Sequence, residues 1–220
     1  EDSYNTGKIE GSTSIGGLVG IAKGTTSGTS KVTRCYNTGN ISGNNVGGII
    51  GGKSGFLVSG LNIERCYNTG NIEGKDYLAG ITSYLPKASY VKDSYNIGDI
   101  KGTGKNIGGI TGENYEPRQT TIEVNSTYVM DSYNYGNLSD GAGAITGAGY
   151  KGKNKNNYYL ETSIKNPSDI DSDLRAKSIE KFRSGEVAYF LDQRSKNSRK
   201  YLWSQGSVYP VLSGKPVYKI

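Results

Sequence analysis

Short apolar segments separated by polar and turn-forming residues recur along the first 150 residues. The most regular segment reads Cys or Ser, Tyr, Asn, a variable residue, Gly, a second variable residue, and Ile or Leu. We call it the tyrosine phrase. With the residue that precedes it, it occurs five times, at residues 2–9, 34–41, 65–72, 93–100 and 131–138. Self-similarity with such a period is typical of solenoids and other repeat architectures.

Two further apolar segments accompany the tyrosine phrase. A glycine-rich segment of the type Ile-Gly-Gly-Ile-x-Gly follows it at residues 15–20, 46–51, 78–83, 107–112 and 142–147. A β-branched residue stands four positions before the later tyrosines, at Val32, Ile63, Val91 and Val129. Each repeat therefore predicts three short strands. The tyrosine spacings of 32, 31, 28 and 38 residues are unequal, which places the insertions in loops.

Stacking of these repeats is the arrangement that the pattern favours. Repeated glycines disfavour helices, and no apolar period of 3.6 residues is present. Strands with so few apolar residues cannot bury a face as isolated hairpins. Stacked coils remove the difficulty, because equivalent strands pair in parallel and align their Ile and Val side chains inside. We predict a mainly β protein, a right-handed parallel β-solenoid of about five coils with three short strands each.

Each position of the phrase then has an expected structural role. Asn-x-Gly is expected to form a corner through left-handed backbone conformations, and the following Ile to fill the core. The paired glycines of the second segment should let the coil walls approach each other, and the tyrosines should stack along one edge, facing either inward or outward. The residues assigned to this framework are Tyr4, Tyr36, Tyr67, Tyr95, Tyr133, Asn5, Asn37, Asn68, Asn96, Asn134, Gly7, Gly39, Gly70, Gly98, Gly136, Cys35 and Cys66.

The C-terminal part of the chain has a different pattern. We divide the protein into a repeat region, residues 1–150, and a capping region, residues 151–220, and expect residues 157–160 to form a degenerate sixth strand. A helix is predicted to begin at Asp171 or Ser172 and to run over Leu174, Ile179 and Phe182, with Gly185 ending or kinking it and an apolar side continuing over residues 186–193. Short strands should follow around residues 201–203 and 208–212. Such a small α+β unit would cover the open strand edge and apolar core of the last coil.

The two segments together resemble a known repeat. The tetrad Gly17-Leu18-Val19-Gly20 and its variants resemble the GLUG repeat. Combined with the tyrosine phrase, the pattern resembles GLUG-type coils of Gram-positive, clostridial-like bacterial surface proteins, which occur in IgA1-protease-like peptidases and adhesin-like proteins. Residues 184–189, 203–205 and 209–212 are similar to segments that close such arrays. The resemblance implies an extracellular address and a non-catalytic role for the repeats, and the His-Glu-x-x-His zinc motif of the peptidase part is absent.

Composition limits the chemistry further. The chain has no histidine, which excludes His-based general bases, Ser-His or Cys-His nucleophilic pairs and the usual zinc sites. No cofactor or metal is expected. β-Solenoid enzymes can instead work with carboxylates and a basic residue, and the candidates here are Asp93, Asp99 and Asp131 with Arg34, Arg65 or Lys101. Most of these share one repeat position with Asp2, which favours a surface ladder over a singular catalytic site.

Charge and hydropathy separate the two regions. Residues 1–150 hold 12 Lys and Arg against 13 Asp and Glu, whereas residues 151–220 hold 14 against 7. The basic residues Arg194, Lys196, Arg199 and Lys200 could contact anionic wall polymer, or they form a solvated loop. No recognition motif for nucleic acid accompanies them. No stretch of about 18 apolar residues is present, so no membrane insertion is expected, and the chain reads as a segment of a longer protein.

The two cysteines occupy the same place in consecutive repeats. Stacked, buried free thiols are one interpretation, and a disulfide is the other. Side chains on neighbouring parallel strands lie about 4.8 Å apart, which is farther than disulfide geometry prefers. The expected pair is therefore free thiols, with the disulfide left open.

Ligand contacts are expected outside the tyrosine phrase. The loops at residues 20–31, 52–62 and 113–127 should emerge on one side of the stack, and tyrosines in or near loops could stack on glycans. These are Tyr77, Tyr84, Tyr90, Tyr115 and Tyr128. We expect a non-catalytic extracellular module of a bacterial surface or secreted protein that spaces or presents an adhesive surface to a host glycan, a host protein or wall polymer. The alternative is a substrate-positioning region of a secreted peptidase or glycan-active enzyme.

Overall fold

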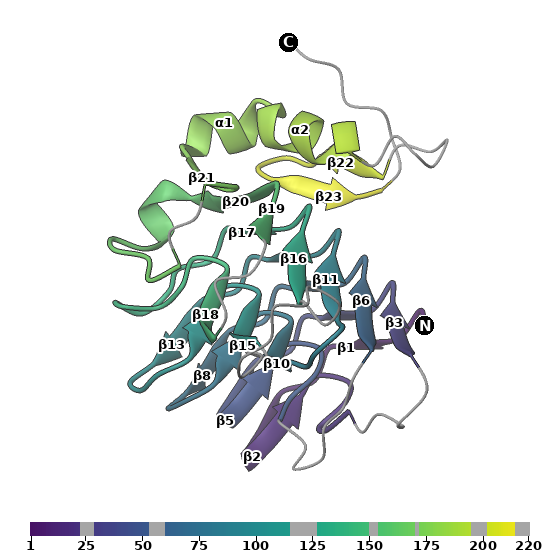
Figure 1. The fold of residues 1–220 in the computed structure, drawn as a ribbon, viewed down its shortest axis with the longest axis vertical. Coiled ribbons are helices and arrows are strands. Elements are labelled where there is room, and N and C mark those ends of the chain that lie inside the picture. Colours follow the sequence, from purple (N-terminus) through teal and green to yellow (C-terminus); the bar gives the residue numbers. More distant parts are fainter. Residues whose placement is uncertain are drawn as a thin grey trace, which may run out of the picture.

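The computed structural model describes residues 1–22, 29–52, 60–114, 127–149, 154–169, 172–194 and 202–213. The protein is 47% strand and 9% helix, and its parallel sheets form a β-solenoid of about four turns with a small helical C-terminal part. The coils stack from the N-terminal end towards a cap that lies across the opposite end (Figure 1). The predicted β-solenoid fold is thus confirmed.

The tyrosine phrase forms one wall of the solenoid, which we call the tyrosine sheet. Its strands pair in parallel with tyrosine beside tyrosine and asparagine beside asparagine from one coil to the next. Two later strands extend the sheet, so that residues 157–160 do form the predicted additional strand. The order is β1 (Tyr4–Asn5), β4 (Tyr36–Asn37), β7 (Tyr67–Asn68), β12 (Tyr95–Asn96), β17 (Tyr133–Asn134), β20 (Asn157–Leu160) and β21 (Leu174–Lys177).

The second wall begins with the Ile that ends each tyrosine phrase, and we call it the groove sheet. Its strands are β2 (Ile9–Gly16), β5 (Ile41–Gly47), β8 (Ile72–Gly74), β9 (Leu78–Ala79), β13 (Ile100–Gly102) and β14 (Ile107–Gly108). The glycine-rich segment was predicted as one strand. It instead divides between the end of this sheet and a third, which contains β10 (Thr82–Leu85), β15 (Thr111–Asn114) and β18 (Thr146–Gly149).

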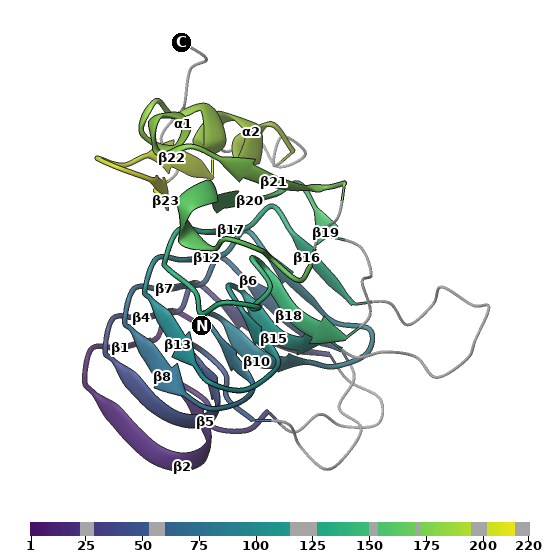
Figure 2. The same ribbon diagram turned by 90° about the vertical axis from the view of Figure 1, so that its left-hand side faces the viewer.

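The β-branched segments form strands, as predicted, and these strands close each turn in a fourth sheet. Its strands are β3 (Ser30–Thr33), β6 (Leu61–Glu64), β11 (Tyr90–Lys92), β16 (Tyr128–Met130) and β19 (Asn154–Lys155). The rows of strands follow one another from coil to coil in both views of the ribbon (Figures 1 and 2). Two columns of buried Ile, Val and Leu side chains run along the inside of the solenoid.

Each coil turns before the tyrosine and bends again at the phrase glycine, where the chain passes from the tyrosine sheet to the groove sheet, so the predicted position of the Asn-x-Gly corner is confirmed. The residue two positions before the tyrosine has a positive φ in every copy, for example 55° at Arg34 and 49° at Asp93. The phrase asparagines and glycines are not among the positive-φ residues, so the left-handed conformation predicted for the Asn-x-Gly corner is wrong. A left-handed conformation is uncommon for residues with a Cβ atom, and Asp adopts it more readily than most. The left-handed turn therefore lies before the tyrosine sheet and not after it.

The phrase asparagines form a continuous ladder inside the solenoid. The Nδ2 of Asn37 donates to Asn68 Oδ1 at 2.7 Å, and Asn68 Nδ2 donates to Asn96 Oδ1 at 2.8 Å. Each Nδ2 also donates to the carbonyl oxygen of the phrase glycine two residues later, as Asn68 does to Gly70 at 2.7 Å. Asn37, Asn68, Asn96 and Asn134 have no exposed surface. The buried amides are satisfied by one another, so the ladder fixes the register between coils.

Close backbone contact explains the phrase glycines. A Cβ atom added to Gly70 would lie 2.0 Å from the carbonyl oxygen of Gly39, the equivalent glycine one coil earlier. In the second segment, a Cβ on Gly48 would lie 2.1 Å from Gly80 O and 2.7 Å from Asn68 Cβ. The paired glycines therefore allow the predicted close approach of the walls, because they leave room for the asparagine ladder.

The C-terminal cap closes the last coil with hydrogen bonds as well as apolar contacts. In earlier coils the glycine-rich segment donates its N–H groups to carbonyls of the next coil, as Ile81 does to Ile110. In the last coil, Asp169 takes the place of these carbonyls. Its carboxylate accepts the N–H groups of Ala144, Ile145 and Thr146 at 2.7, 2.8 and 2.7 Å. The described chain thus replaces a missing coil with one side chain.

The remaining cap elements are a 3-10 helix (Glu161–Ser163), α1 (Ile179–Arg183), α2 (Glu186–Arg194), β22 (Trp203–Gln205) and β23 (Pro210–Leu212). The 3-10 helix lies at the end of the groove sheet, where Ser163 O accepts the N–H of Leu138 at 2.9 Å, and the other elements pack over the tyrosine sheet. The predicted helix is confirmed over Ile179 and Phe182 and again over residues 186–193. It is wrong over Leu174, because Leu174–Lys177 pairs with β20 as strand β21 and the helix begins only after Ser178. Gly185 has a φ of 85° and separates α1 from α2, as predicted. Phe182, Trp203 and Leu191 are fully buried against the last tyrosines of the stack.

Candidate functional site

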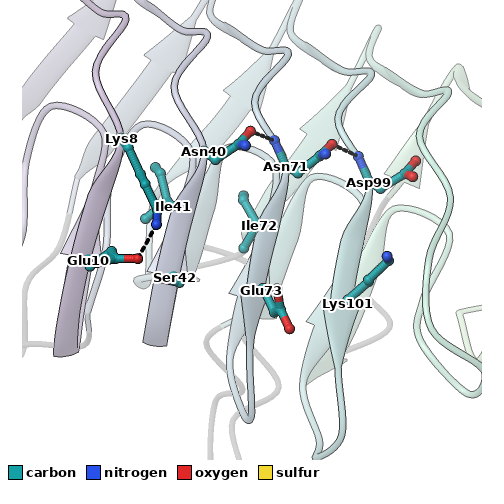
Figure 3. Close-up of a pocket in the computed structure, with 10 residues that line it drawn as sticks. All are labelled: Lys8, Glu10, Asn40, Ile41, Ser42, Asn71, Ile72, Glu73, Asp99 and Lys101. Atoms are coloured by element: carbon teal, nitrogen blue, oxygen red, sulfur yellow. Dashed lines mark hydrogen bonds and ion pairs between the residues drawn. The ribbon is translucent and has the colours of Figure 1, made fainter.

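A polar groove lies on the outer face of the groove sheet. It has a volume of about 230 Å³ and is lined by Lys8, Glu10, Asn40, Ile41, Ser42, Asn71, Ile72, Glu73, Asp99 and Lys101. The strand alternation produces it, because Ile41 and Ile72 point into the core and the residues on either side of each Ile point outward. Two rows of polar side chains therefore border a floor of backbone, and they run from coil to coil (Figure 3).

The first row is tied to the backbone of the neighbouring coil. The Oδ1 of Asn40 accepts the N–H of Asn71 at 3.0 Å, and Asn71 Oδ1 accepts the N–H of Asp99 at 3.0 Å. Asp99 Oδ1 in turn accepts the N–H of Asn137 at 2.9 Å. Within the described residues, the Nδ2 groups of Asn40 and Asn71 donate to no protein acceptor. The row thus presents fixed amide donors to solvent (Figure 3).

The second row carries most of the charge. Lys8 of the first row forms an ion pair with Glu10 of the second, both on the first coil. Glu73 and Lys101 are register neighbours on β8 and β13, yet neither forms an ion pair with any described residue. Both are exposed. The groove therefore offers hydrogen-bond donors, acceptors and charges of both signs to a ligand.

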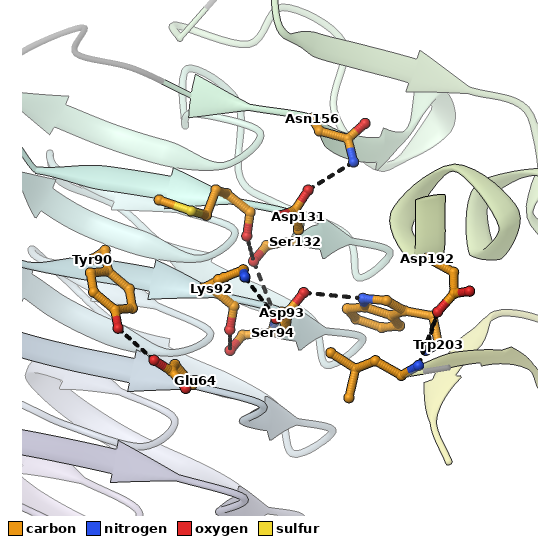
Figure 4. A network of polar contacts seen from close by, with 12 residues as sticks. Glu64, Tyr90, Lys92, Asp93, Ser94, Asp131, Ser132, Asn156, Asp192 and Trp203 are labelled. Carbon is orange, nitrogen blue, oxygen red and sulfur yellow. Dashed lines mark hydrogen bonds and ion pairs between the residues drawn. The ribbon is translucent and has the colours of Figure 1, made fainter. Parts of the chain in front are cut away.

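The structure separates the predicted carboxylates into two places. Asp99 and Lys101 lie together in the groove, whereas Asp93 and Asp131 lie at the corner before the tyrosine sheet, at the edge covered by the cap. They are 4% and 6% exposed, so the predicted surface ladder is wrong at this end. Asp93 accepts the indole N–H of Trp203 at 3.4 Å, and Asp131 accepts an amide N–H of Asn156 at 2.9 Å (Figure 4). These two carboxylates face the cap and are not available to a substrate.

Burial has an electrostatic consequence at Asp93. It raises the pKa of this carboxyl to about 6, and the nearby Asp131 adds to the increase. Lys92, with its Nζ 3.7 Å from the carboxylate, Trp203 and Arg65 act in the opposite direction. The group titrates in an interface between cap and solenoid, which makes it a determinant of stability.

The predicted basic residues Arg34 and Arg65 also lie at the corner before the tyrosine sheet and not in the groove. Arg34 forms a bidentate pair with Asp2 on the preceding coil, with both N–O distances at 2.6 Å. Arg34 also contacts Glu1 at 3.2 Å. Glu64, beside Arg65 in the sequence, pairs with Lys31 at 3.1 Å and accepts a hydrogen bond from the hydroxyl of Tyr90 at 2.5 Å (Figure 4). The exposed first step of this ladder, from Asp2 to Arg34, therefore pairs opposite charges.

The tyrosines proposed for glycan contact do not form one site. Tyr77 lies between β8 and β9 with a φ of 57°, and Tyr84 lies on β10. Tyr90 and Tyr128 are register neighbours on β11 and β16. Tyr90 is held by Glu64, and Lys155 Nζ lies 5.1 Å from the ring centroid of Tyr128. Tyr115 lies outside the described residues.

The repeated tyrosines face outward and stack on one another. Their ring centroids are 5.0, 4.9, 4.9 and 5.1 Å apart, and adjacent rings are within 6° of parallel. Exposure falls along the stack, from 63% at Tyr4 to 0% at Tyr133, because the cap covers the later rings. Ring faces inside a stack are occupied by neighbouring rings, so the stack offers edges to a sugar and not faces. The stack is a structural feature.

Cys35 and Cys66 are buried free thiols. The thiol of Cys35 donates to Thr33 O and that of Cys66 to Glu64 O, each at 3.3 Å. Burial raises the pKa of the Cys66 thiol to about 12, which makes it a poor nucleophile. In the later coils Ser takes this position and its hydroxyl accepts a backbone N–H, as Ser94 does from Cys66 at 3.1 Å.

Other predicted ligand elements fall largely outside the described residues. These include most of the loops at 20–31, 52–62 and 113–127, and Lys196, Arg199 and Lys200 of the basic tail, while Arg194 ends α2. Within the described ranges, no cluster of three or more His, Cys, Asp or Glu could hold a metal ion. In the same ranges, no helix has the length and apolarity needed to cross a membrane.

Comparison of the chain with protein-family models, with curated proteins and with solved structures finds no match. The class of protein is therefore defined by its own architecture, a parallel β-solenoid with a C-terminal cap and a polar groove on one outer face.

The repeat pattern of the sequence predicted part of the groove but not the rest. Asp99 and Lys101 were singled out, but the other lining side chains occupy the variable positions on either side of the phrase Ile. Variable positions look uninformative when the repeat is read for what its copies share. The alternation of a strand around a buried Ile is the signal that would have placed them on one outer surface.

Proposed function

We propose that this chain is a non-catalytic, extracellular repeat module of a bacterial surface or secreted protein, which holds and presents a binding surface. The proposal rests on the observation that the repeated residues of the tyrosine phrase are occupied in contacts between coils. Its asparagines, glycines and tyrosines bond or stack on the equivalent residues of the neighbouring coil. Residues repeated in this way build a stiff rod, and binding is left to the outer faces.

Side-chain ladders support the spacer part of this function. Parallel strands in continuous register, an internal amide ladder and an external ring stack resist shear between coils. Asp169 and the cap close the C-terminal end, so that the described chain ends in a covered core. The extracellular and bacterial assignments follow from the resemblance to GLUG-type repeats.

A glycan array and a pull-down from host-cell surface proteins test the presenting part. Binding in either assay supports an adhesive module, and no binding in both overturns it. Single-molecule stretching tests the spacer part, for which we expect an abrupt rupture of several coils. Gradual extension at low force would contradict a rigid spacer.

The second candidate is a substrate-positioning region of a secreted peptidase or glycan-active enzyme, favoured by the groove with Asp99, Lys101 and Glu73. It predicts that the module raises the activity of a neighbouring catalytic domain towards an extended substrate. Cleavage of a polysaccharide by the isolated module, lost in Asp99→Asn, would overturn the non-catalytic proposal.

A further inference from the structure

We propose that the polar groove on the groove sheet binds a linear, uncharged polysaccharide that runs along the solenoid axis with about one sugar ring per coil. This inference rests on the proposed function, since it names the ligand class for the surface that the module presents. Three features of the groove lead to it: its direction, its floor and its charge.

The direction of the groove suits a polymer of regular repeat. Asn40, Asn71 and Asp99 occupy one row across neighbouring strands, and Ser42, Glu73 and Lys101 occupy the other (Figure 3). Neighbouring strands are about 4.8 Å apart, which is close to the length of one pyranose ring in an extended chain. The two rows are separated by two residues along each strand, or about 7 Å, which is the width of a single sugar chain. Each coil can therefore contact one ring with both rows.

The floor of the groove argues against a peptide ligand. Strands β5 and β8 are interior strands of their sheet, so their backbone groups are already paired and cannot accept an added strand. The two apolar residues in the lining, Ile41 and Ile72, are each 1% exposed and provide no pocket for a side chain. Sugar hydroxyls both donate and accept hydrogen bonds, which matches free amide N–H groups in one row and a hydroxyl and a carboxylate in the other.

The charge of the groove selects among polysaccharides. Its lining contains the cations Lys8 and Lys101 and the anions Glu10, Glu73 and Asp99, for a net charge of −1. Lys8 is already paired with Glu10. Uronate or phosphate polymers would bring further negative charge towards unpaired carboxylates, and like charges at this distance repel. A neutral chain avoids this cost.

The test uses the whole chain and protein-detected NMR titration with three hexasaccharides: cellohexaose and N-acetylchitohexaose, both neutral, and hexagalacturonate, which is anionic. We expect a neutral hexasaccharide to shift, saturably, the amide signals of residues 40–42, 71–73 and 99–101. If neither neutral hexasaccharide shifts any of these signals at millimolar concentration, the proposal is overturned, as it is by stronger binding of hexagalacturonate in the groove.

The decisive variant is Asn40→Asp with Asn71→Asp. It retains the Oδ1 acceptors that hold the next coil and removes the amide donors that face the groove, and Asp99 already fills the same position with a carboxylate. Loss of two hydrogen bonds predicts at least fivefold weaker binding of the neutral ligand. The matched control, Asn62→Asp, makes the same change on the outer side of β6 and should bind as the wild type does.

Equal affinity of the double variant and the wild type, with an unchanged unfolding temperature, overturns the groove assignment. Binding on an array that maps to another face overturns it as well, but leaves the proposed adhesive function intact. Absence of binding to any ligand in every assay counts against both.

Discussion

Replacement of Asn68 by Ala tests whether the internal amide ladder holds the coils together. Asn68 is fully buried and makes three hydrogen bonds: to Gly70 O at 2.7 Å, to Asn96 Oδ1 at 2.8 Å, and from Asn37 Nδ2 at 2.7 Å. Each contributes about 1 kcal/mol, and leaving buried partners unsatisfied costs a further 1 to 3 kcal/mol or so. The expected loss in free energy of unfolding is about 4 to 6 kcal/mol.

Urea unfolding followed by far-ultraviolet circular dichroism measures this loss. Two variants serve as controls. Asn62→Ala removes an amide from the outer side of β6 and should change stability by less than about 0.5 kcal/mol. Asn5→Ala removes the first, half-buried member of the ladder and should cost about 1 to 2 kcal/mol. A loss below about 1 kcal/mol for Asn68→Ala, or equal losses at positions 5 and 68, would refute the reasoning.

Three further changes address the glycines, the corner carboxylate and the cap. Gly70→Ala places a Cβ 2.0 Å from Gly39 O, so we expect it to lower the free energy of unfolding, measured in urea, by at least about 3 kcal/mol. The control is Gly141→Ala, whose Cβ meets no atom within 4 Å. It should cost only about 1 kcal/mol, because residue 141 has a φ of 77°. Asp93 has a folded pKa of about 6 against 3.8 for the free side chain, so the native state binds the proton more tightly and stability falls as the pH rises from about 4 to 6. Asp93→Asn should remove this loss of stability with rising pH and raise the free energy of unfolding at pH 7.5 by up to about 3 kcal/mol. Thermal unfolding across the pH range measures the effect. An unchanged pH dependence in the variant would contradict the assignment to Asp93. Trp203→Ala should lower the free energy of unfolding by about 3 to 5 kcal/mol and release the cap from the tyrosine stack. The release is measured as rapid amide hydrogen exchange in α1 and α2. Wild-type protection of these two helices in the variant would show that the cap docks without Trp203.

The repeat itself made most of the fold predictable. Five copies of one phrase, the glycine-rich segments and the β-branched residues predicted stacked parallel strands, and these strands pair in register. Local sequence carries this information because each copy repeats the same periodicity and the same small residues. The order of strands in a coil follows directly.

Contacts between coils decided what the local sequence left open. Asn-x-Gly suggested a left-handed corner, and the chain does bend there, but without positive φ, because the asparagine serves the amide ladder and the glycine allows close approach of Gly39 and Gly70. Leu174–Lys177 suggested the start of a helix, but the free edge of β20 recruits it as a strand. In both places pairing with a distant segment outweighed local propensity.

The candidate site shows the same division. By itself, the sequence determined that a β-solenoid forms and that each phrase Ile enters its core, since the apolar period is local. Only the tertiary structure decided that variable residues from successive repeats form one groove, and that Asp93 and Asp131 lie beneath the cap and away from Asp99. The physical reason is that side chains about 30 residues apart become neighbours at about 4.8 Å only when the coils stack.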